Sequence, residues 1–347
     1  MSNQCELPDA PSDAISAVRF SPSSTKLLVS SWDKHVYLYD VSKEAGDSPR
    51  LIQKFEHRAP VLDVCWGKDD SEAYSGGLDW DVRRIDLKSS EQTVLSSHSS
   101  AAKSLAFSAS HNILVSASWD CTLHIHHIGT TTTPATIPLP HKPFSLSLSP
   151  TRLVVAMASR QLHIYDLPAL SALSAQASQA PPNTLELEPW QRRESSLKFM
   201  TRAVACMPND EGYASSSIEG RVAVEWFDPS VESQARKYAF KCHRQTVDGV
   251  DVVYPVNALS YHPVYGTFAS GGGDGVVALW DGVAKRRIKQ YQKYSASVVA
   301  LAWNGDGTRL AVGVSPGFED GKEVEEGVIK IYIREVAEGE AKGKGGK

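Results

Sequence analysis

Four cationic side chains lie at turn-like points between short alternating runs of residues 191–244, namely Arg202, Arg221, Lys241 and Arg244. Arg and Lys bind phosphate and carboxylate groups through charge-assisted hydrogen bonds. Residues 222–226 alternate between two faces, which predicts a strand, and Gly220 ends the turn before it. Arg221 therefore lies at the mouth of a hairpin, where it can reach a ligand. Exposed Arg and Lys side chains at turns are usually only solvated. Whether these four form a binding site therefore depends on how the rest of the chain folds.

Three histidines near Cys121 raise the question of a metal site: His124, His126 and His127. They fall on a predicted strand, where successive side chains point to opposite faces and do not converge on one ion. His126 also occupies the position that Tyr39 and Trp280 hold in similar segments elsewhere in the chain. We therefore interpret these histidines as structural and predict no metal site.

The glycine-rich run GGGDG at residues 271–275 has the composition of a phosphate-binding loop. No lysine follows it and no helix is predicted after it, so it is interpreted as a hairpin turn. The chain also lacks the G-x-S-x-G, H-E-x-x-H and protein-kinase motifs. These observations predict a protein that is not an enzyme, with no catalytic residues and no cofactor.

The elements that would position the cations are copies of one repeating unit. Each copy has an alternating run, an apolar run, a polar turn and a second alternating run that often ends in Asp. The copies lie at residues 15–41, 61–87, 102–128, 143–167, 202–228, 256–281 and 298–333. The polar turns include Trp32-Asp33, Leu78-Asp79, Trp119-Asp120, Ser159-Arg160, Glu219-Gly220-Arg221 and Asp274-Gly275.

The spacing of these copies predicts the fold. The turn aspartates 33, 79 and 120 are 46 and 41 residues apart, close to the ~40–45 residues of a four-stranded propeller blade. Stacked units bury their apolar faces on each other, and closure into a ring leaves only short edges. His57, His98 and His141 precede first strands, as is common in WD repeats. The sequence predicts an all-β, seven-bladed WD-repeat β-propeller, closed by an outer strand near Glu6 and Leu7.

One propeller accounts for residues 1–336, with two insertions. Residues 168–190 are rich in Ala, Ser, Gln and Pro and are predicted to form a loop insertion, in which LSALSAQ could form a helical turn. Residues 316–327 form a loop in the last blade. The tail, residues 337–347, is a Gly/Lys/Glu low-complexity segment and is predicted to be disordered.

Composition limits the function classes. The net charge of −4 shows no excess of cations, so direct nucleic-acid binding is not expected. The five cysteines are scattered and form no C-x-x-C pair, which indicates reduced thiols. No apolar run approaches the ~20 residues of a membrane helix, and the N-terminus has no signal-peptide pattern. We expect a soluble intracellular protein without membrane contact.

The turns of a propeller and the segments before its first strands share one face. This rule gathers Trp32, Trp80 and Trp119 with Arg202, Arg221 and Lys241. Aromatic and Arg side chains dominate protein interfaces, and clustered cations read phosphate or carboxylate groups. The sequence therefore predicts a peptide-binding face.

Specific motifs in the first, fifth and sixth repeats resemble a known family. They are SSWD, QRRESSLK, SSIEGRVAVE, YAFKCHR and YPVNA. The chain resembles the spindle-checkpoint WD-repeat family, member three of the budding-uninhibited-by-benzimidazole group, from Ser12 to Arg334. The resemblance implies a kinetochore adaptor in the mitotic nucleus that is monomeric alone. It would bind phosphorylated Met-Glu-Leu-Thr repeats of the kinetochore scaffold. It would also bind a short helical motif in a checkpoint kinase and its pseudokinase relative.

The resemblance also implies roles for individual residues. The phosphothreonine would meet Arg221 and Lys241, with Arg202 in support, and Trp32 would pack on apolar residues of the same peptide. The partner helix would lie on the face that carries Trp80, Trp119 and Glu219.

Two alternatives remain open at this point. The messenger-RNA export propeller of the nuclear pore has a similar IEGR-type turn and FKCHR-type segment, and it binds a helical motif in a nucleoporin. YPVNA, SSWD and QRRESSLK favour the checkpoint family. A substrate-receptor propeller of a ubiquitin ligase would have seven repeats but no reason to carry these motifs.

Overall fold

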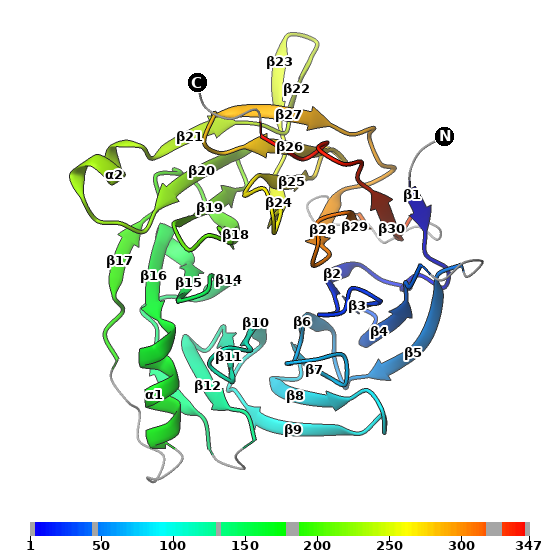
Figure 1. Ribbon diagram of the computed structural model, residues 1–347, viewed down its shortest axis with the longest axis vertical. Helices are drawn as coiled ribbons and strands as arrows, with labels where there is room; N and C mark the ends of the chain where they lie inside the picture. The colour runs from blue at the N-terminus through cyan, green and yellow to red at the C-terminus, as the bar shows by residue number, and fades with distance from the viewer. Residues whose placement is uncertain (1–3, 44–47, 130–132, 178–186, 317–327, 344–347) are drawn as a thin grey trace.

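The computed structural model describes residues 4–43, 48–129, 133–177, 187–316 and 328–343. Its strands form seven four-stranded antiparallel sheets and one two-stranded hairpin. The seven sheets are arranged as blades around a central axis (Figure 1). The prediction of a seven-bladed β-propeller is confirmed.

In blades 1 to 6 the strands follow the chain order from the axis outward, whereas the outermost strand of blade 7 comes from the N-terminal segment. Blade 1 comprises β2 (Ile15–Phe20), β3 (Lys26–Ser31), β4 (His35–Asp40) and β5 (Arg50–Glu56). Blade 2 comprises β6 (Val61–Trp66), β7 (Glu72–Gly77), β8 (Asp81–Asp86) and β9 (Gln92–Ser97). Blade 3 comprises β10 (Ala102–Ser108), β11 (Ile113–Ser118), β12 (Thr122–His127) and β13 (Ala135–Pro138). Blade 4 comprises β14 (Pro143–Leu148), β15 (Arg152–Met157), β16 (Gln161–Asp166) and β17 (Gln191–Glu194).

The remaining strands complete the ring. Blade 5 comprises β18 (Thr201–Cys206), β19 (Gly212–Ser217), β20 (Arg221–Trp226) and β21 (Tyr238–Lys241). Blade 6 comprises β24 (Val256–Tyr261), β25 (Phe268–Gly272), β26 (Val277–Asp281) and β27 (Arg286–Gln290). Blade 7 comprises β28 (Val298–Trp303), β29 (Arg309–Val314), β30 (Lys330–Glu335) and β1 (Gln4–Glu6). Between blades 5 and 6 the hairpin of β22 (Arg244–Val247) and β23 (Val250–Val253) extends outside the ring (Figure 1).

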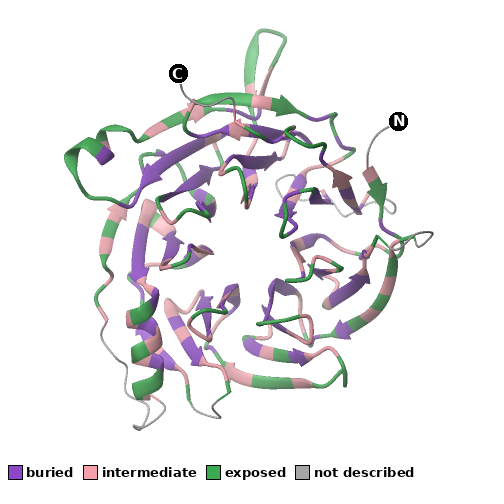
Figure 2. Ribbon diagram, viewed as in Figure 1, coloured by how far each residue is buried: buried purple, intermediate pink, exposed green. Residues whose placement is uncertain are grey.

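The core lies between neighbouring blades. Buried residues concentrate on the inner strands, and exposed residues on the outermost ones (Figure 2). For example, Leu28 and Leu38 of blade 1 pack in one cluster with Val64 and Ile85 of blade 2. Because each sheet buries its apolar face only on its neighbours, the blades stabilise one another only as a set.

The ring is closed by the N-terminal segment, as the sequence predicts. β1 pairs antiparallel with β30, with Gln4 opposite Arg334 and Glu6 opposite Tyr332. Lys330 Nζ lies 3.1 Å from Glu6 Oε2 across the same pair of strands. The first and last segments of the chain therefore share one blade.

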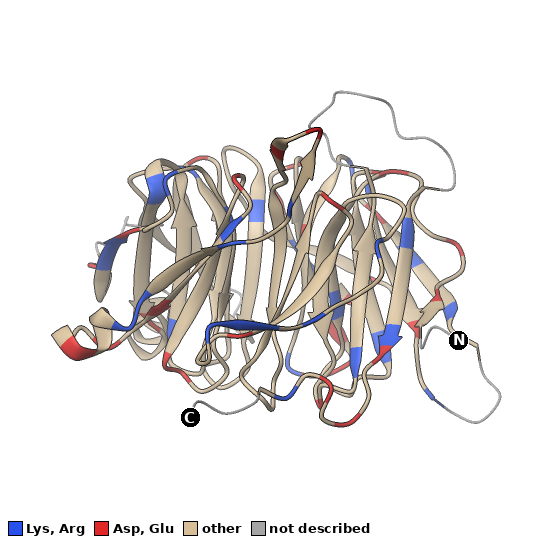
Figure 3. Ribbon diagram, turned by 90° about the horizontal axis from the view of Figure 1, so that it is seen from above, with Lys and Arg blue, Asp and Glu red and all other residues tan. Residues whose placement is uncertain are grey.

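The strands run between two faces of the ring, which carry different turns (Figure 3). We call the face with the turns between second and third strands, such as residues 32–34, the upper face. It also carries the segments that lead into the first strands. The opposite face, with the turns between first and second strands, is the lower face.

In the described ranges, helical structure is limited to α1 (Leu167–Ala177), α2 (Val231–Ala235) and the 3-10 turn η1 (Ala158–Arg160). The described start of the predicted 168–190 loop insertion is thus a helix of 11 residues, whose buried Leu170 packs in the cluster of blades 3 and 4. Residues 178–186 of the predicted insertion lie outside the described residues. The predicted 316–327 loop does so as well, apart from Pro316. Within the described ranges, neither helix has the length and hydrophobicity to span a membrane.

The tail differs from its expected disorder over residues 337–343. Ala341 is buried, and its carbonyl accepts a hydrogen bond from Thr267 Oγ1 of blade 6 (2.7 Å). Glu340 accepts from the Tyr291 hydroxyl (2.6 Å) and lies 3.0 Å from Lys289 Nζ. These contacts fix a segment whose composition alone predicts disorder. Residues 344–347 lie outside the described residues.

Removing residues 337–347 should therefore destabilise the propeller by about 2 kcal/mol, because one neutral and one charge-assisted hydrogen bond are lost with the buried Ala341. Urea denaturation of the truncated and full chains measures the difference. Truncation after Gly343 is the control, since it keeps all these contacts. Equal denaturation midpoints for both truncations would contradict the structural role of the segment.

Candidate functional site

Two of the predicted phosphate-binding cations are direct neighbours on blade 5. Arg221, the first residue of β20, is paired in register with Lys241, the last residue of β21. Paired residues of adjacent antiparallel strands point to the same side of the sheet, with the strands about 4.7–4.9 Å apart. Lys241 is exposed, and 35% of the Arg221 side chain is accessible. Both charges can therefore reach one ligand.

A third cation joins them from the segment between blades 5 and 6. Arg244 Nη2 lies 3.4 Å and 3.5 Å from the carbonyl oxygens of Glu219 and Gly220, to which it donates. Arg221 Nε lies 3.5 Å from Glu219 Oε2. The Nε atoms of Arg221 and Arg244 are buried without a hydrogen-bond partner among the described residues. Such groups are costly unless a ligand or solvent supplies the acceptor.

Lys241 and Arg244 also line a cavity of about 210 Å³ together with Arg287 of β27. Arg287 belongs to blade 6, so this cavity spans the junction of two blades. Arg244 and Arg287 were not among the predicted site residues. The FKCHR segment indicates Arg244, but Arg287 is a plain surface residue in the sequence and no motif identifies it.

The position of Arg221 depends on the turn before it. Gly220 has φ +64°, and an added Cβ would lie 2.7 Å from the carbonyl oxygen of Cys242. The Gly220 carbonyl in turn accepts a hydrogen bond from the Cys242 amide (2.9 Å). Glycine is therefore required here, both for the left-handed backbone and for the close contact with the next segment.

Gly220→Ala should destabilise the protein by more than the roughly 1–2 kcal/mol of the left-handed backbone alone, because the Cβ also clashes with the Cys242 carbonyl. Gly249→Ala is the matched control, since Gly249 has φ +77° and open space around it. Chemical denaturation of both variants measures the difference. Equal destabilisation by both substitutions would show that the turn yields to the added methyl group.

A buried hydrogen-bond network holds the segment that carries Lys241 and Arg244. His243 bonds Asp274 Oδ1 through Nδ1 (2.8 Å) and Ser270 Oγ through Nε2 (2.7 Å). Trp280 Nε1 donates to the same Ser270 Oγ (2.8 Å). Blade 3 repeats the pattern with His98, whose ring nitrogens lie 3.2 Å from Asp120 Oδ2 and 2.9 Å from Ser116 Oγ. His98 and His243 are thus structural supports for the upper face.

A second group of predicted residues meets on the axis. Trp32, Trp119 and Arg202 line one cavity of about 310 Å³ at the upper face. Arg202 Nε donates to Asn257 Oδ1 (3.1 Å), which positions its guanidinium. Trp119 Nε1 is buried and lacks a hydrogen-bond partner among the described residues. An apolar cavity with few polar groups is typical of a ligand site.

The backbone explains which residues reach this cavity. In every blade the register of the first strand shifts after its first residue, as at a β-bulge. The residues at that shift line the cavity, and they are Ser16, Leu62, Lys103, Phe144, Arg202, Asn257 and Val299. Bulges re-aim side chains in this way. Sequence reasoning missed Lys103, although aligning the seven repeats at this position would have identified it.

Lys103 adds a second cation to the axis. Burial lowers the pKa of its ammonium group, and the nearby Asp63 carboxylate opposes that shift. An incoming carboxylate would favour the charged form of Lys103. The cavity therefore combines two cations, Lys103 and Arg202, with the rings of Trp32, Trp119 and Phe144.

Two predicted residues do not join this cavity. Trp80 is 50% exposed on the turn between β7 and β8 and does not line it. Glu219 is half-buried beside Arg221, so it belongs to the blade 5 group rather than to a separate helix-binding surface. The predicted face is thus divided into two groups. The axial group consists of Trp32, Lys103, Trp119 and Arg202, and the blade 5 group consists of Glu219, Arg221, Lys241 and Arg244.

The histidines of blade 3 form a compact buried cluster. Ser96 Oγ lies 3.1 Å from His124 Nδ1 and 3.0 Å from His126 Nε2, and the rings of His98 and His124 stack at 3.7 Å. Burial lowers the pKa of His124 to about 3 and that of His126 to about 4, so both are neutral at pH 7. Across the described ranges, no three His, Cys, Asp or Glu side chains are arranged to hold a metal ion.

Comparison with known proteins gives a consistent result. The WD domain, G-beta repeat family matches residues 3–40, 89–127 and 237–281. The chain is 45% identical to the mitotic checkpoint protein BUB3.1 of Arabidopsis thaliana over 344 residues, covering 98% of this chain and 94% of that protein. It is 36% identical to the mitotic checkpoint protein bub3 of Dictyostelium discoideum, covering 92% and 90% of the two chains. Identity to the poly(A)+ RNA export protein of Schizosaccharomyces pombe is 30%, with 97% and 92% covered.

Proposed function

This chain belongs to the BUB3 family of mitotic checkpoint proteins, and we propose that it is a non-enzymatic adaptor of the spindle checkpoint. It binds phosphorylated Met-Glu-Leu-Thr repeats of the kinetochore scaffold through the blade 5 group, and the peptide extends from there to Trp32. It binds a short helical motif of a checkpoint kinase, and of its pseudokinase relative, through the axial group. It acts as a monomer in the nucleus and at kinetochores in mitosis.

The single observation that carries this proposal is the in-register pairing of Arg221 with Lys241 beside Arg244. A phosphothreonine brings about −1.5 to −2 charges and three acceptor oxygens at neutral pH. Cations on adjacent strands match such a compact, multiply charged group.

The axial group fits a helical peptide that carries carboxylates. Lys103 and Arg202 can pair with acidic side chains, and the rings of Trp119 and Phe144 can contact its apolar face. Arg202 engages a carboxylate through its planar fork, whereas Lys103 acts as a point charge. The two groups thus suit two different ligands.

Isothermal titration calorimetry tests this function with three peptides. We expect the phosphorylated Met-Glu-Leu-Thr repeat to bind at least about tenfold more tightly than the unphosphorylated one, since each charge-assisted bond contributes on the order of 1.5–3 kcal/mol. We expect the helical motif of the checkpoint kinase to bind as well. Equal affinity for both forms of the repeat would contradict the proposal.

The similarity to RNA export proteins makes an export role the second candidate. A nucleoporin helix is therefore added to the same titration as a fourth peptide. Tighter binding of that helix than of the checkpoint-kinase helix would favour the export role. A substrate-receptor role would instead predict co-purification with a cullin adaptor.

A further inference from the structure

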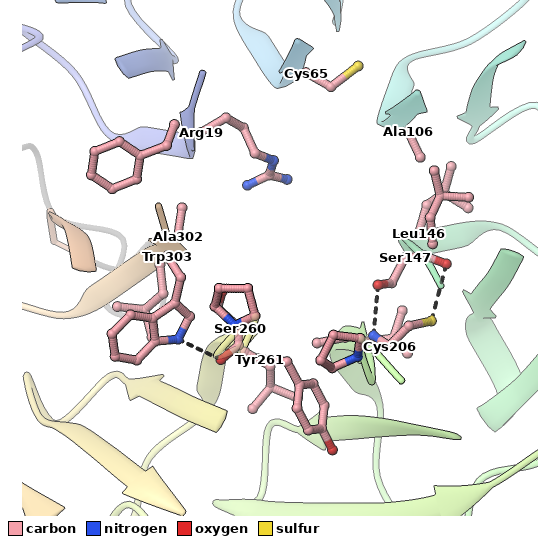
Figure 4. Close-up of a pocket in the computed structure, with 18 of the residues that line it drawn as sticks. Arg19, Cys65, Ala106, Leu146, Ser147, Cys206, Ser260, Tyr261, Ala302 and Trp303 are labelled. Atoms are coloured by element: carbon pink, nitrogen blue, oxygen red, sulfur yellow. Dashed lines mark hydrogen bonds between the residues drawn. The ribbon is translucent and has the colours of Figure 1, made fainter. Parts of the chain in front are cut away.

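The lower face has an axial cavity of its own, which the proposed function does not use. It has a volume of about 520 Å³ and is lined by the ends of the first strands from all seven blades (Figure 4). Most of the lining residues are apolar, among them Phe20, Phe107, Leu148, Leu259, Pro263 and Trp303, while polar atoms make up about half of the exposed lining. Its volume lies within the roughly 300–1,000 Å³ range of ligand sites.

The cavity contains one charged side chain among its described lining residues, Arg19 of β2. Figure 4 shows its guanidinium extending into the open centre. Arg19 Nη2 donates to Asp63 Oδ1 (3.1 Å), and Nη1 donates to the Val18 carbonyl (2.9 Å). Guanidinium has five N–H donors, so three remain available for a ligand. The Arg19 side chain is 39% exposed.

Asp63 accepts hydrogen bonds from other donors besides Arg19. Its carboxylate also accepts hydrogen bonds from the Val64 amide, the Ser104 hydroxyl and the Leu105 amide, each at 2.9 Å. The oxygens of this buried carboxylate are therefore hydrogen-bonded by three donors besides Arg19. It therefore holds Arg19 in place while the guanidinium can still bind a second carboxylate.

Blade 6 carries two exposed apolar side chains in the loop next to this cavity. Val264 and Tyr265, which follow the lining residue Pro263, are 65% and 37% exposed. Their loop is rigidly supported, because both of their backbone amides donate to His262 Nδ1 (3.1 Å each). His262 is buried, and its Nε2 lies 3.1 Å from the carbonyl oxygen of Gly307 in blade 7. The hydrogen bonds of His262 thus hold the loop that carries Val264 and Tyr265 in one conformation.

We propose that this cavity binds a short peptide segment of a partner protein, with one carboxylate side chain followed by aliphatic side chains. The carboxylate pairs with Arg19, and the aliphatic side chains fill the apolar cavity. The single cation selects a single carboxylate, because a polyanion such as nucleic acid would require several cations. The exposed Val264 and Tyr265 favour a peptide over an isolated small molecule, since they offer contact to a chain that leaves the cavity.

An array of capped peptides tests this site on the full chain. Each peptide has a Glu or a Gln followed by two positions that vary over the aliphatic residues. We expect some Glu peptides to bind, and each to bind about tenfold or more tightly than its Gln counterpart. If no Glu peptide binds at concentrations on the order of millimolar, or if Glu and Gln peptides bind equally, the proposal is overturned.

Variants then locate the binding. Arg19→Gln should remove the preference for Glu over Gln, and its thermal melting reports whether the fold survives. Val264→Asp should weaken the Glu peptides about tenfold by charge repulsion at the cavity rim. Val283→Asp is the matched control, because Val283 is 75% exposed on the turn between β26 and β27 of blade 6, whereas Val264 directly follows the lining residue Pro263. Equal affinity of the Val264→Asp and Val283→Asp variants would exclude this cavity as the binding site.

This test is independent of the upper face. The Arg202→Ala variant, altered in the axial cavity of the upper face, should bind the Glu peptides as the unmodified chain does. Loss of Glu-peptide binding in that variant would assign the peptides to the upper face and overturn the proposal.

Discussion

Arg221→Ala should weaken binding of the phosphorylated Met-Glu-Leu-Thr repeat by at least about tenfold, since a charge-assisted hydrogen bond contributes on the order of 1.5–3 kcal/mol. The loss should be confined to the phosphorylated peptide. Lys241 would remain as a point charge, and Arg244 would remain held by the carbonyl oxygens of Glu219 and Gly220. Calorimetry with the two peptide forms measures the effect.

The pH dependence supplies a second measurement of the same contact. The second pKa of phosphothreonine is about 6, so the peptide loses one negative charge as the pH falls through that value. Binding to the unmodified chain should weaken below about pH 6, and the Arg221→Ala variant should show a smaller decrease.

Lys237→Ala is the matched control for Arg221→Ala. Lys237 is an exposed cation just before β21, at the other end of the strand from Lys241. Its removal changes the net charge equally but touches no residue of the blade 5 group. If Lys237→Ala and Arg221→Ala weaken the phosphopeptide to the same extent, the effect is long-range charge and the assigned contact is wrong.

The sequence predicted the ring because the fold depends on local, repeated features. Alternation of apolar residues and the spacing of Asp33, Asp79 and Asp120 identify the units. The order of residues 337–343 was not predicted, because it depends on contacts with residues far away in the sequence. The contacts of Glu340 with Tyr291 and Lys289 join segments about 50 residues apart, and its composition carries no sign of them.

The site was predicted only in part, for reasons that lie in the turns and strands. Trp32 and Trp119 precede the turn aspartate and line the axial cavity, whereas Trp80 follows it, has φ +72° and lies outside that lining. A one-residue difference within a tight turn thus redirects the side chain. Lys103 was missed because a bulge, rather than simple alternation, turns it toward the axis.

Trp32→Ala should weaken the phosphopeptide by about 2 kcal/mol, roughly thirtyfold, because truncation of an aromatic side chain in an interface removes buried apolar area. Trp32 is half-buried in the axial cavity, where its ring can contact the apolar residues of the repeat. The salt dependence of binding should be unchanged, since Arg221 and Lys241 are intact. Calorimetry at two salt concentrations measures both quantities.

Trp119→Ala is the comparison that separates the two ligands. Trp119 lines the same cavity as Trp32, but we assign it to the helical motif, so its truncation should weaken the helix more than the phosphopeptide. The proposal also requires both ligands to bind at once, the helix over the axis and the phosphopeptide from the blade 5 group toward Trp32. A competition titration decides this arrangement. If a saturating helical motif displaces the phosphopeptide, the two ligands do not bind at once. If Trp32→Ala weakens binding of the helix only, the phosphopeptide does not contact Trp32.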